Sequence, residues 1–120
     1  MDKKILIIDD ELDVMKMLVY RLKAKGYEIV TASNAKEGIS TAKKETPDLI
    51  ILDYRLPDAG PLEVPRKLKE EEALRNTPVI LVTASIDGIA EKAKECNAVD
   101  YIPKPIDPDE LYKKIEKHIK

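Results

Sequence analysis

The chain has 120 residues, with 21 basic and 23 acidic side chains, one histidine and a formal net charge of −2. This length fits one domain, in which about two-thirds of the surface of the extended chain can be buried without disulfides or metals. The 43% of hydrophobic residues is typical of a soluble globular protein.

Composition excludes several classes of protein. No apolar run approaches the roughly 18 residues of a membrane span. Only four apolar residues, 5–8, follow the start of the chain, so we expect no secretory signal and no membrane contact. A single cysteine, Cys96, fits a reducing, cytoplasmic setting. The four glycines are too widely spaced for a glycine-rich phosphate loop. A near-neutral charge without Trp or Phe argues against direct nucleic-acid binding.

Short apolar runs alternate with stretches of helical periodicity along the whole chain. The runs, which predict strands, are 5–8, 28–32, 49–52, 79–82 and the weaker 99–102. Helical spacing follows each run: from Leu12 to Leu22, from Asn34 to about Lys44, through Val64, Leu68 and Leu74, from Ile89 to near Asn97, and through Leu111, Ile115 and Ile119.

Residues at the ends of these stretches indicate helix boundaries. Gly26 is the expected residue just beyond the end of the first helix. Asn34 with Glu37 resembles a capping box at the start of the second. Asp107 followed by Pro108 is typical of a helix N-cap and first helical position.

Five βα units in residues 1–120 predict a single α/β domain. Continuous runs of Ile, Leu and Val are typical of parallel strands that are covered on both faces. Regular βα alternation favours right-handed crossovers. An open, doubly wound sheet is favoured over a barrel, because a barrel of eight such units needs about 250 residues.

Polar residues that could take part in catalysis or binding lie where the predicted strands end. Asp9 and Asp10 follow the first strand, and Asp53 follows the third. Thr83 ends the fourth strand, and Lys104 follows the fifth. Because open α/β sheets form their sites at the carboxyl ends of the strands, we expect these five side chains to converge on one edge.

This set of residues suits metal-assisted chemistry on phosphate. Carboxylates packed together repel one another, and a hard cation such as Mg²⁺ relieves that repulsion while accepting phosphate oxygens. Aspartate is a nucleophile for phosphoryl groups, and a lysine can share the charge of the group in transfer. Each residue also has an ordinary explanation taken singly, such as Asp9 or Asp10 capping a helix and Asp53 ending a strand.

Four segments together resemble the receiver domain of two-component response regulators. They are Ile7-Ile8-Asp9-Asp10-Glu11, Leu52-Asp53-Tyr54-Arg55-Leu56-Pro57, Thr83-Ala84, and Asp100-Tyr101-Ile102-Pro103-Lys104-Pro105. The resemblance covers the chain end to end. It implies a flavodoxin-like sheet of order 2-1-3-4-5, an Mg²⁺ cofactor, and phosphorylation by a sensor histidine kinase or a phosphotransfer protein.

The resemblance also implies a role for each acid. Asp53 is the implied phosphoacceptor. Asp10 and Asp53 are the implied direct Mg²⁺ ligands, together with the backbone carbonyl of Arg55, and Asp9 is implied to reach the metal through water. The Arg55 side chain flanks the position at which similar domains tune hydrolysis.

The resemblance implies that the remaining matched residues bind the phosphoryl group and couple phosphorylation to a conformational change. Lys104 is the implied phosphate partner, and similarity to the family favours a cis peptide bond between it and Pro105. Thr83 is the implied switch hydroxyl, whose movement the ring of Tyr101 would follow. Taken alone, Tyr101 also reads as a half-buried strand residue. Ser85 is the second residue expected to influence hydrolysis.

Two features depart from the family pattern. Gly60-Pro61 stands where similar domains usually carry Asp-Gly, so the loop after the third strand could take a different path. Pro65 would cost about 3 kcal/mol inside a helix, so we expect the third helix to start late, with Pro65 in its first turn.

The output is the least defined part of the prediction. The chain could be a complete regulator that signals by docking or a receiver from a longer protein, and its downstream protein partner is unknown. The surface formed by the fourth helix, fifth strand and fifth helix is the implied switch. Apart from catalysing its own phosphorylation and dephosphorylation on Asp53, we expect no enzymatic activity on an independent substrate.

Two other functions are considered. An aspartyl-phosphate phosphatase generally needs a second acid shortly after the nucleophile, whereas Tyr54 and Arg55 follow Asp53 here. A flavin-binding domain would carry Ser, Thr and Gly in the first βα turn, whereas residues 9–11 are all acidic and repel phosphate without a metal. Multiple turnover on phosphate esters would favour the first function, and a yellow protein the second.

Overall fold

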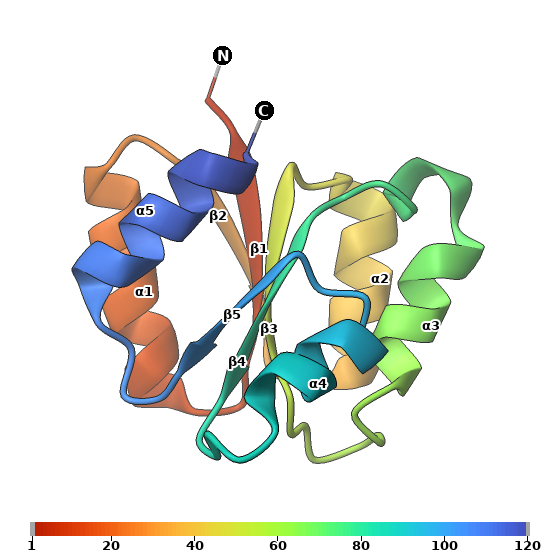
Figure 1. Ribbon diagram of the computed structural model, residues 1–120. Helices are drawn as coiled ribbons and strands as arrows, with labels where there is room; N and C mark the ends of the chain where they lie inside the picture. The colour runs from red at the N-terminus through yellow and green to blue at the C-terminus, as the bar shows by residue number, and fades with distance from the viewer. Residues whose placement is uncertain (1, 120) are drawn as a thin grey trace.

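Five parallel strands form the centre of the molecule, in the order β2-β1-β3-β4-β5 (Figure 1). The structure is a computed structural model that describes residues 2–119. The strands are β1 (Lys4–Ile8), β2 (Glu28–Ala32), β3 (Leu49–Asp53), β4 (Val79–Thr83) and β5 (Asp100–Pro103). The helices are α1 (Leu12–Ala24), α2 (Ala35–Glu45), α3 (Glu63–Glu70), the short 3₁₀ helix η1 (Glu72–Leu74), α4 (Ile89–Glu95) and α5 (Pro108–His118). The predicted doubly wound α/β fold and its strand order are confirmed.

Helices cover both faces of the sheet, as the continuous apolar strands require. Helices α1 and α5 lie on one side, and α2, α3 and α4 lie on the other (Figure 1). Alternate residues of β1 serve the two cores: Ile5 and Ile7 pack with α1 and α5, whereas Leu6 and Ile8 pack with α2 and α3. Within residues 2–119, no helix is both long enough and apolar enough to cross a membrane.

Helix α3 is shorter than the sequence pattern predicts. The predicted helix through Leu74 ends at Glu70, and Leu74 lies in the separate 3₁₀ helix η1. Leu74 is still buried in the core with Val64 and Leu68, which explains why its spacing resembled that of one helix. The prediction for Pro65 is confirmed, since it is the third residue of α3, where a backbone N–H has no partner within the helix.

The last βα unit differs from prediction by about one residue at its boundaries. Strand β5 runs over Asp100–Pro103 rather than 99–102, and Val99 is exposed. The predicted cap of α5 is confirmed, because the Asp109 amide donates to Asp107 Oδ1 at 3.0 Å. Ile119 follows the end of α5 and still packs against the core.

The start of α2 is held by two side chains, of which the sequence indicated only one. The Glu37 amide donates to Asn34 Oδ1 at 2.8 Å, as expected for an N-cap. The amides of Ala35 and Lys36 donate to the two carboxylate oxygens of Asp58, at 2.7 and 3.0 Å. Asp58 therefore ties the loop after β3 to the positive end of α2. These backbone hydrogen bonds lower the pKa of the Asp58 carboxyl.

Gly38 allows α2 to approach β1 closely. A Cβ at this position would lie 2.7 Å from Cδ1 and 3.0 Å from Cγ2 of Ile8, whose side chain is fully buried. Ile8 directly precedes the acidic residues that follow β1, so this contact fixes the strand end next to the site.

Gly38→Ala is expected to lower the free energy of unfolding by about 1 kcal/mol. Overpacking a core costs roughly 1–3 kcal/mol, and the better helix propensity of alanine offsets close to 1 kcal/mol of that. Urea denaturation measures the change. Gly60→Ala is the matched control, because a Cβ there meets no atom within 4 Å and stability should hold within about 0.5 kcal/mol. Equal stabilities of the two variants would contradict the close packing of α2 on β1.

Candidate functional site

Three carboxylates meet at the carboxyl ends of β1 and β3. Asp9 and Asp10 directly follow β1, and Asp53 is the last residue of β3. Because Ile8 pairs with Leu52 in parallel register, the residue after each lies at the same level of the sheet. One oxygen from each of the three carboxylates lies within 4.8 Å of the others. Asp9 and Asp53 are only 3% and 7% exposed, whereas Asp10 is exposed.

Among residues 2–119, a single ammonium group, that of Lys104, lies within ion-pair distance of this cluster. The Lys104 amide donates to the carbonyl of Thr83 at 2.8 Å, which extends the β4–β5 pairing by one step. The peptide bond between Lys104 and Pro105 is cis, as expected. Nζ lies 3.1 Å from Asp9 Oδ2 and 3.3 Å from Asp53 Oδ2.

The charges of the cluster shift the pKa values of Asp53 and Lys104. Burial and the neighbouring charge of Asp9 raise the pKa of Asp53 to about 6, against a partial opposing effect of Lys104 and the Arg55 amide. Burial alone lowers the pKa of Lys104, but hydrogen bonds to Glu11 and Asp9 and the charge of Asp53 raise it above its usual value. Lys104 is therefore a fixed cation, while Asp53 is a carboxylate that its surroundings destabilise.

Thr83 and Tyr101 share one face of the sheet near this cluster. Leu81 pairs with Tyr101 across β4 and β5, and Thr83 lies two residues beyond Leu81 on the same face. The Thr83 side chain is 2% exposed, and its Oγ1 accepts a hydrogen bond from the Ser85 amide at 3.2 Å. The Tyr101 ring is partly buried and packs against the cluster that contains Leu81 and α4.

An open pocket of about 330 Å³ lies over the carboxylates. Asp10, Asp53, Arg55 and Lys104 all line it. The Arg55 amide donates to Asp53 Oδ1 at 3.2 Å, which holds the start of the loop against the site. Carboxylate and carbonyl oxygens are the ligands that Mg²⁺ prefers, and a dication would relieve the repulsion between the buried acids. The residues present therefore fit a magnesium ion.

Two contacts near the site were missed by sequence reasoning. Glu11, used there only as part of a motif, makes an ion pair with Lys104. Asp58, to which the sequence analysis assigned no role, caps α2. The Glu11–Lys104 pair joins residues 93 positions apart, and Asp58 contacts the first residue of α2, 23 positions earlier. Sequence periodicity reports only on neighbours within one helix or strand, so it cannot predict either contact.

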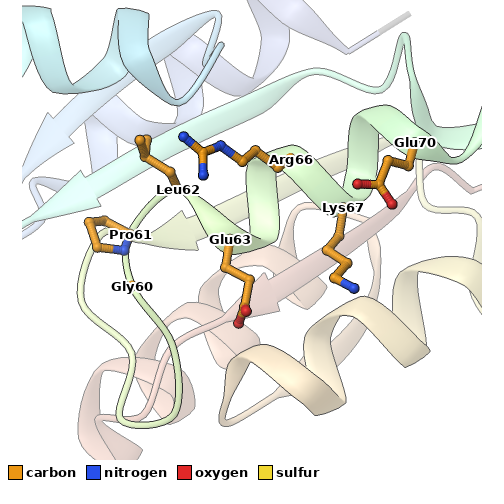
Figure 2. Close-up of a pocket in the computed structure, with 7 residues that line it drawn as sticks. All are labelled: Gly60, Pro61, Leu62, Glu63, Arg66, Lys67 and Glu70. Carbon is orange, nitrogen blue, oxygen red and sulfur yellow. The ribbon is translucent and has the colours of Figure 1, made fainter.

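A separate pocket of about 450 Å³ runs along α3, away from the carboxylates (Figure 2). It is lined by Gly60, Pro61, Leu62, Glu63, Arg66, Lys67 and Glu70. None of the acids at the strand ends lines it, and Gly60-Pro61 forms one end of it. The departure from the usual Asp-Gly therefore changes this pocket rather than the carboxylate edge.

Comparison with known families gives one match over most of the chain. Residues 5–116 match the response regulator receiver domain. The sequence is 35% identical over 117 residues to the alkaline phosphatase synthesis regulatory protein PhoP of Bacillus subtilis, covering 97% of this chain and 48% of that protein. It is 34% identical over 120 residues to the polar-differentiation response regulator DivK of Brucella anthropi, covering 99% and 98%. The chain thus spans about half of PhoP and nearly all of DivK.

Solved structures with the same fold agree. The chemotaxis response regulator CheY4 of Vibrio cholerae superposes with a TM-score of 0.92 at 25% identity, covering 99% of this chain and 100% of that one. The response regulator TrrA of Thermotoga maritima, solved in complex with Mg(2+)-BeF, superposes with a TM-score of 0.85 at 31% identity, covering 98% and 99%.

Asp53→Asn is expected to stabilise the magnesium-free protein at pH 7 by about 1–2 kcal/mol, a value reduced for partial solvent screening. The folded carboxyl has a pKa raised from 3.8 to about 6, so the folded state binds the proton more tightly. The Asp53 carboxyl should therefore contribute a fall in the free energy of unfolding as pH rises from about 4 to 6. The lowered pKa values of Asp58 and Asp100 act in the opposite direction in both proteins, so the fall due to Asp53 is the part of the slope that the variant should lack.

Urea denaturation across pH 4–7, with and without MgCl₂, measures both effects. Added Mg²⁺ should stabilise the wild type more than Asp53→Asn, because binding to the folded state alone raises stability. Asp87→Asn removes the same charge from an exposed loop position and serves as control. A wild type that is more stable than Asp53→Asn at pH 7 without magnesium would contradict the stated repulsion.

Proposed function

Because this chain belongs to the response regulator receiver domain family, we propose that Asp53 accepts a phosphoryl group from a sensor histidine kinase or a phosphotransfer protein. The convergence of Asp53 with Asp9, Asp10 and Lys104 at one edge of the sheet carries the proposal. The receiver domain is proposed to comprise residues 1–120, and to act in the cytoplasm.

The transfer needs little covalent chemistry from the protein. A carboxylate oxygen of Asp53 attacks phosphorus and forms an O–P bond, while the N–P bond to the donor imidazole breaks. The imidazole leaves with that electron pair and takes a proton from water. What the chain supplies is position and charge: Asp53 is held at a buried strand end, beside the ammonium group of Lys104.

Magnesium supplies, when bound, a positive charge that offsets the charge of the transferring phosphoryl oxygens. We propose that Asp10, Asp53 and the carbonyl of Arg55 hold it directly and that Asp9 does so through water. The oxygen cluster of the acids supports this, as does the structural similarity to TrrA, whose complex contains Mg(2+)-BeF. The domain then catalyses its own phosphorylation and dephosphorylation, with Arg55 and Ser85 at the edge where water arrives.

Lys104 and Thr83 are proposed to bind the phosphoryl oxygens once they are in place. Lys104 Nζ already lies 3.3 Å from Asp53 Oδ2, so a small movement brings it to a phosphoryl oxygen. Thr83 Oγ1 accepts from Ser85 and has its own proton free to donate. Movement of Thr83 toward the phosphoryl group opens space for the Tyr101 ring, which changes the α4–β5–α5 surface. An as yet unidentified downstream protein reads that surface.

Acetyl phosphate with Mg²⁺ should label the wild type stoichiometrically, and Asp53→Asn should not label at all. Mass spectrometry of the intact protein, which resolves the added phosphoryl mass, measures this. Asp87→Asn, an exposed acid on the β4–α4 loop, should label as the wild type does. Lys104→Ala should slow labelling by about a hundredfold, since one charged donor to the transferring group is lost. Undiminished labelling of Asp53→Asn would remove Asp53 from the proposed role.

Thr83→Ala should separate phosphorylation from signalling. The variant should still label on Asp53 but lose the response of Tyr101, because the hydroxyl that couples the two is absent. Amide chemical shifts of residues 100–102, recorded with Mg²⁺ and beryllofluoride, report that response. Shift changes in Thr83→Ala as large as those in the wild type would contradict the coupling.

A further inference from the structure

Glu11 stands at the N-cap of α1 but does not cap it. Its backbone is extended (φ −84°, ψ 110°), and its side chain makes no hydrogen bond to the helix. Short polar side chains are favoured at this position because they accept from the first amides of the helix. The Glu11 amide instead donates to Asp9 Oδ1 at 2.9 Å, and the carboxylate extends to Lys104 Nζ. The side chain is thus committed to the lysine.

The Glu11–Lys104 pair differs from the other two contacts of the ammonium group. Asp9 and Asp53 are buried at strand ends, whereas the Glu11 side chain is 57% exposed. A lysine ammonium has three donors, and here three carboxylates accept from it or lie within ion-pair distance. A phosphoryl oxygen that binds Lys104 must therefore displace one of them. Glu11 is the partner that can leave at the least cost, because solvent is beside it.

The pair also forms the boundary between two pockets. One is the pocket of about 330 Å³ over Asp53. The other, of about 380 Å³, is more apolar and is lined by Val14 and Met17 of α1 and by Ile106. Glu11 and Lys104 line both. Ala84 also lines both, so the ion pair forms part of the wall that the two pockets share.

We propose that Glu11 is a positioning residue that competes with the incoming phosphoryl group for the Lys104 ammonium group and so slows phosphorylation of Asp53. The inference rests on the proposed function. Lys104 leaves Glu11 as the phosphoryl oxygen arrives, and the Glu11 carboxylate turns into solvent. Until then, Glu11 occupies a donor of Lys104 and adds a negative charge on the path of an anionic donor. Its removal releases the lysine for the transferring group.

Initial rates of phosphorylation by acetyl phosphate, at saturating MgCl₂, test this. Glu11→Gln should be phosphorylated about twofold to fivefold faster than the wild type, the range expected for one partly exposed ion pair. The gain should shrink as KCl is raised, because exposed charges are screened. A purely structural role for Glu11 would give no such salt dependence.

Two matched variants separate contact from charge. Glu11→Asp keeps the charge but is one methylene shorter and suits the N-cap, so it should release Lys104 and also accelerate phosphorylation without loss of stability. Asp13→Asn removes one charge two residues further along α1, at an exposed position, and should leave the rate unchanged.

Four results would overturn the inference. They are a Glu11→Gln rate equal to or below that of the wild type, a gain that KCl does not reduce, acceleration by Asp13→Asn to the same extent, and a Glu11→Asp rate equal to that of the wild type. The last would show that charge acts through space without the contact. A wild type that acetyl phosphate does not label at all would instead overturn the proposed function.

Discussion

The structure depends on one ammonium group that faces several carboxylates at the carboxyl edge of the sheet. Lys104 is 10% exposed and lies against Asp9, Asp53 and Glu11. Counting Asp10, four negative charges face one positive charge, an excess of 4 − 1 = 3. Lysine therefore makes burial of Asp9 and Asp53 tolerable without neutralising the site. The remaining negative charge is what suits the pocket to a divalent cation.

Most of the fold could be predicted from the sequence, because buried strands, helix ends and site residues each have a recognisable local sequence pattern. Three apolar runs stop at an acid or a hydroxyl where their strands reach the carboxyl edge of the sheet. Caps such as Asn34 and Asp107 mark the starts of helices. The strand order came from the resemblance to receiver domains and not from periodicity, since local patterns carry no information on which strands pair. The predicted third helix extends too far because Leu74 stays buried beyond the end of α3, whereas Val99, predicted to begin the fifth strand, is exposed and precedes β5.

The same limit explains which site contacts were missed. Asp53 and Lys104 could be placed at one edge because both follow strands of one parallel sheet. Glu11 and Asp58 instead contact residues that are distant in sequence and become neighbours only in the folded chain. Acids near helix starts are ordinarily read as caps of their own helix. Here Glu11 leaves its own helix uncapped, and Asp58 caps a helix to which it does not belong. Residue type and position alone cannot separate these cases.

The departure from the family pattern at Gly60-Pro61 lies away from the carboxylate edge. Between Asp53 and Gly60, the loop is fastened by the Arg55 amide to Asp53 and by Asp58 to α2. Gly60-Pro61 lies beyond both attachments and lines the pocket along α3 (Figure 2). The loop can thus change sequence after Asp58 while the carboxylate edge stays intact. These two attachments separate the carboxylate edge from the residues that line the pocket along α3, so the two can vary independently.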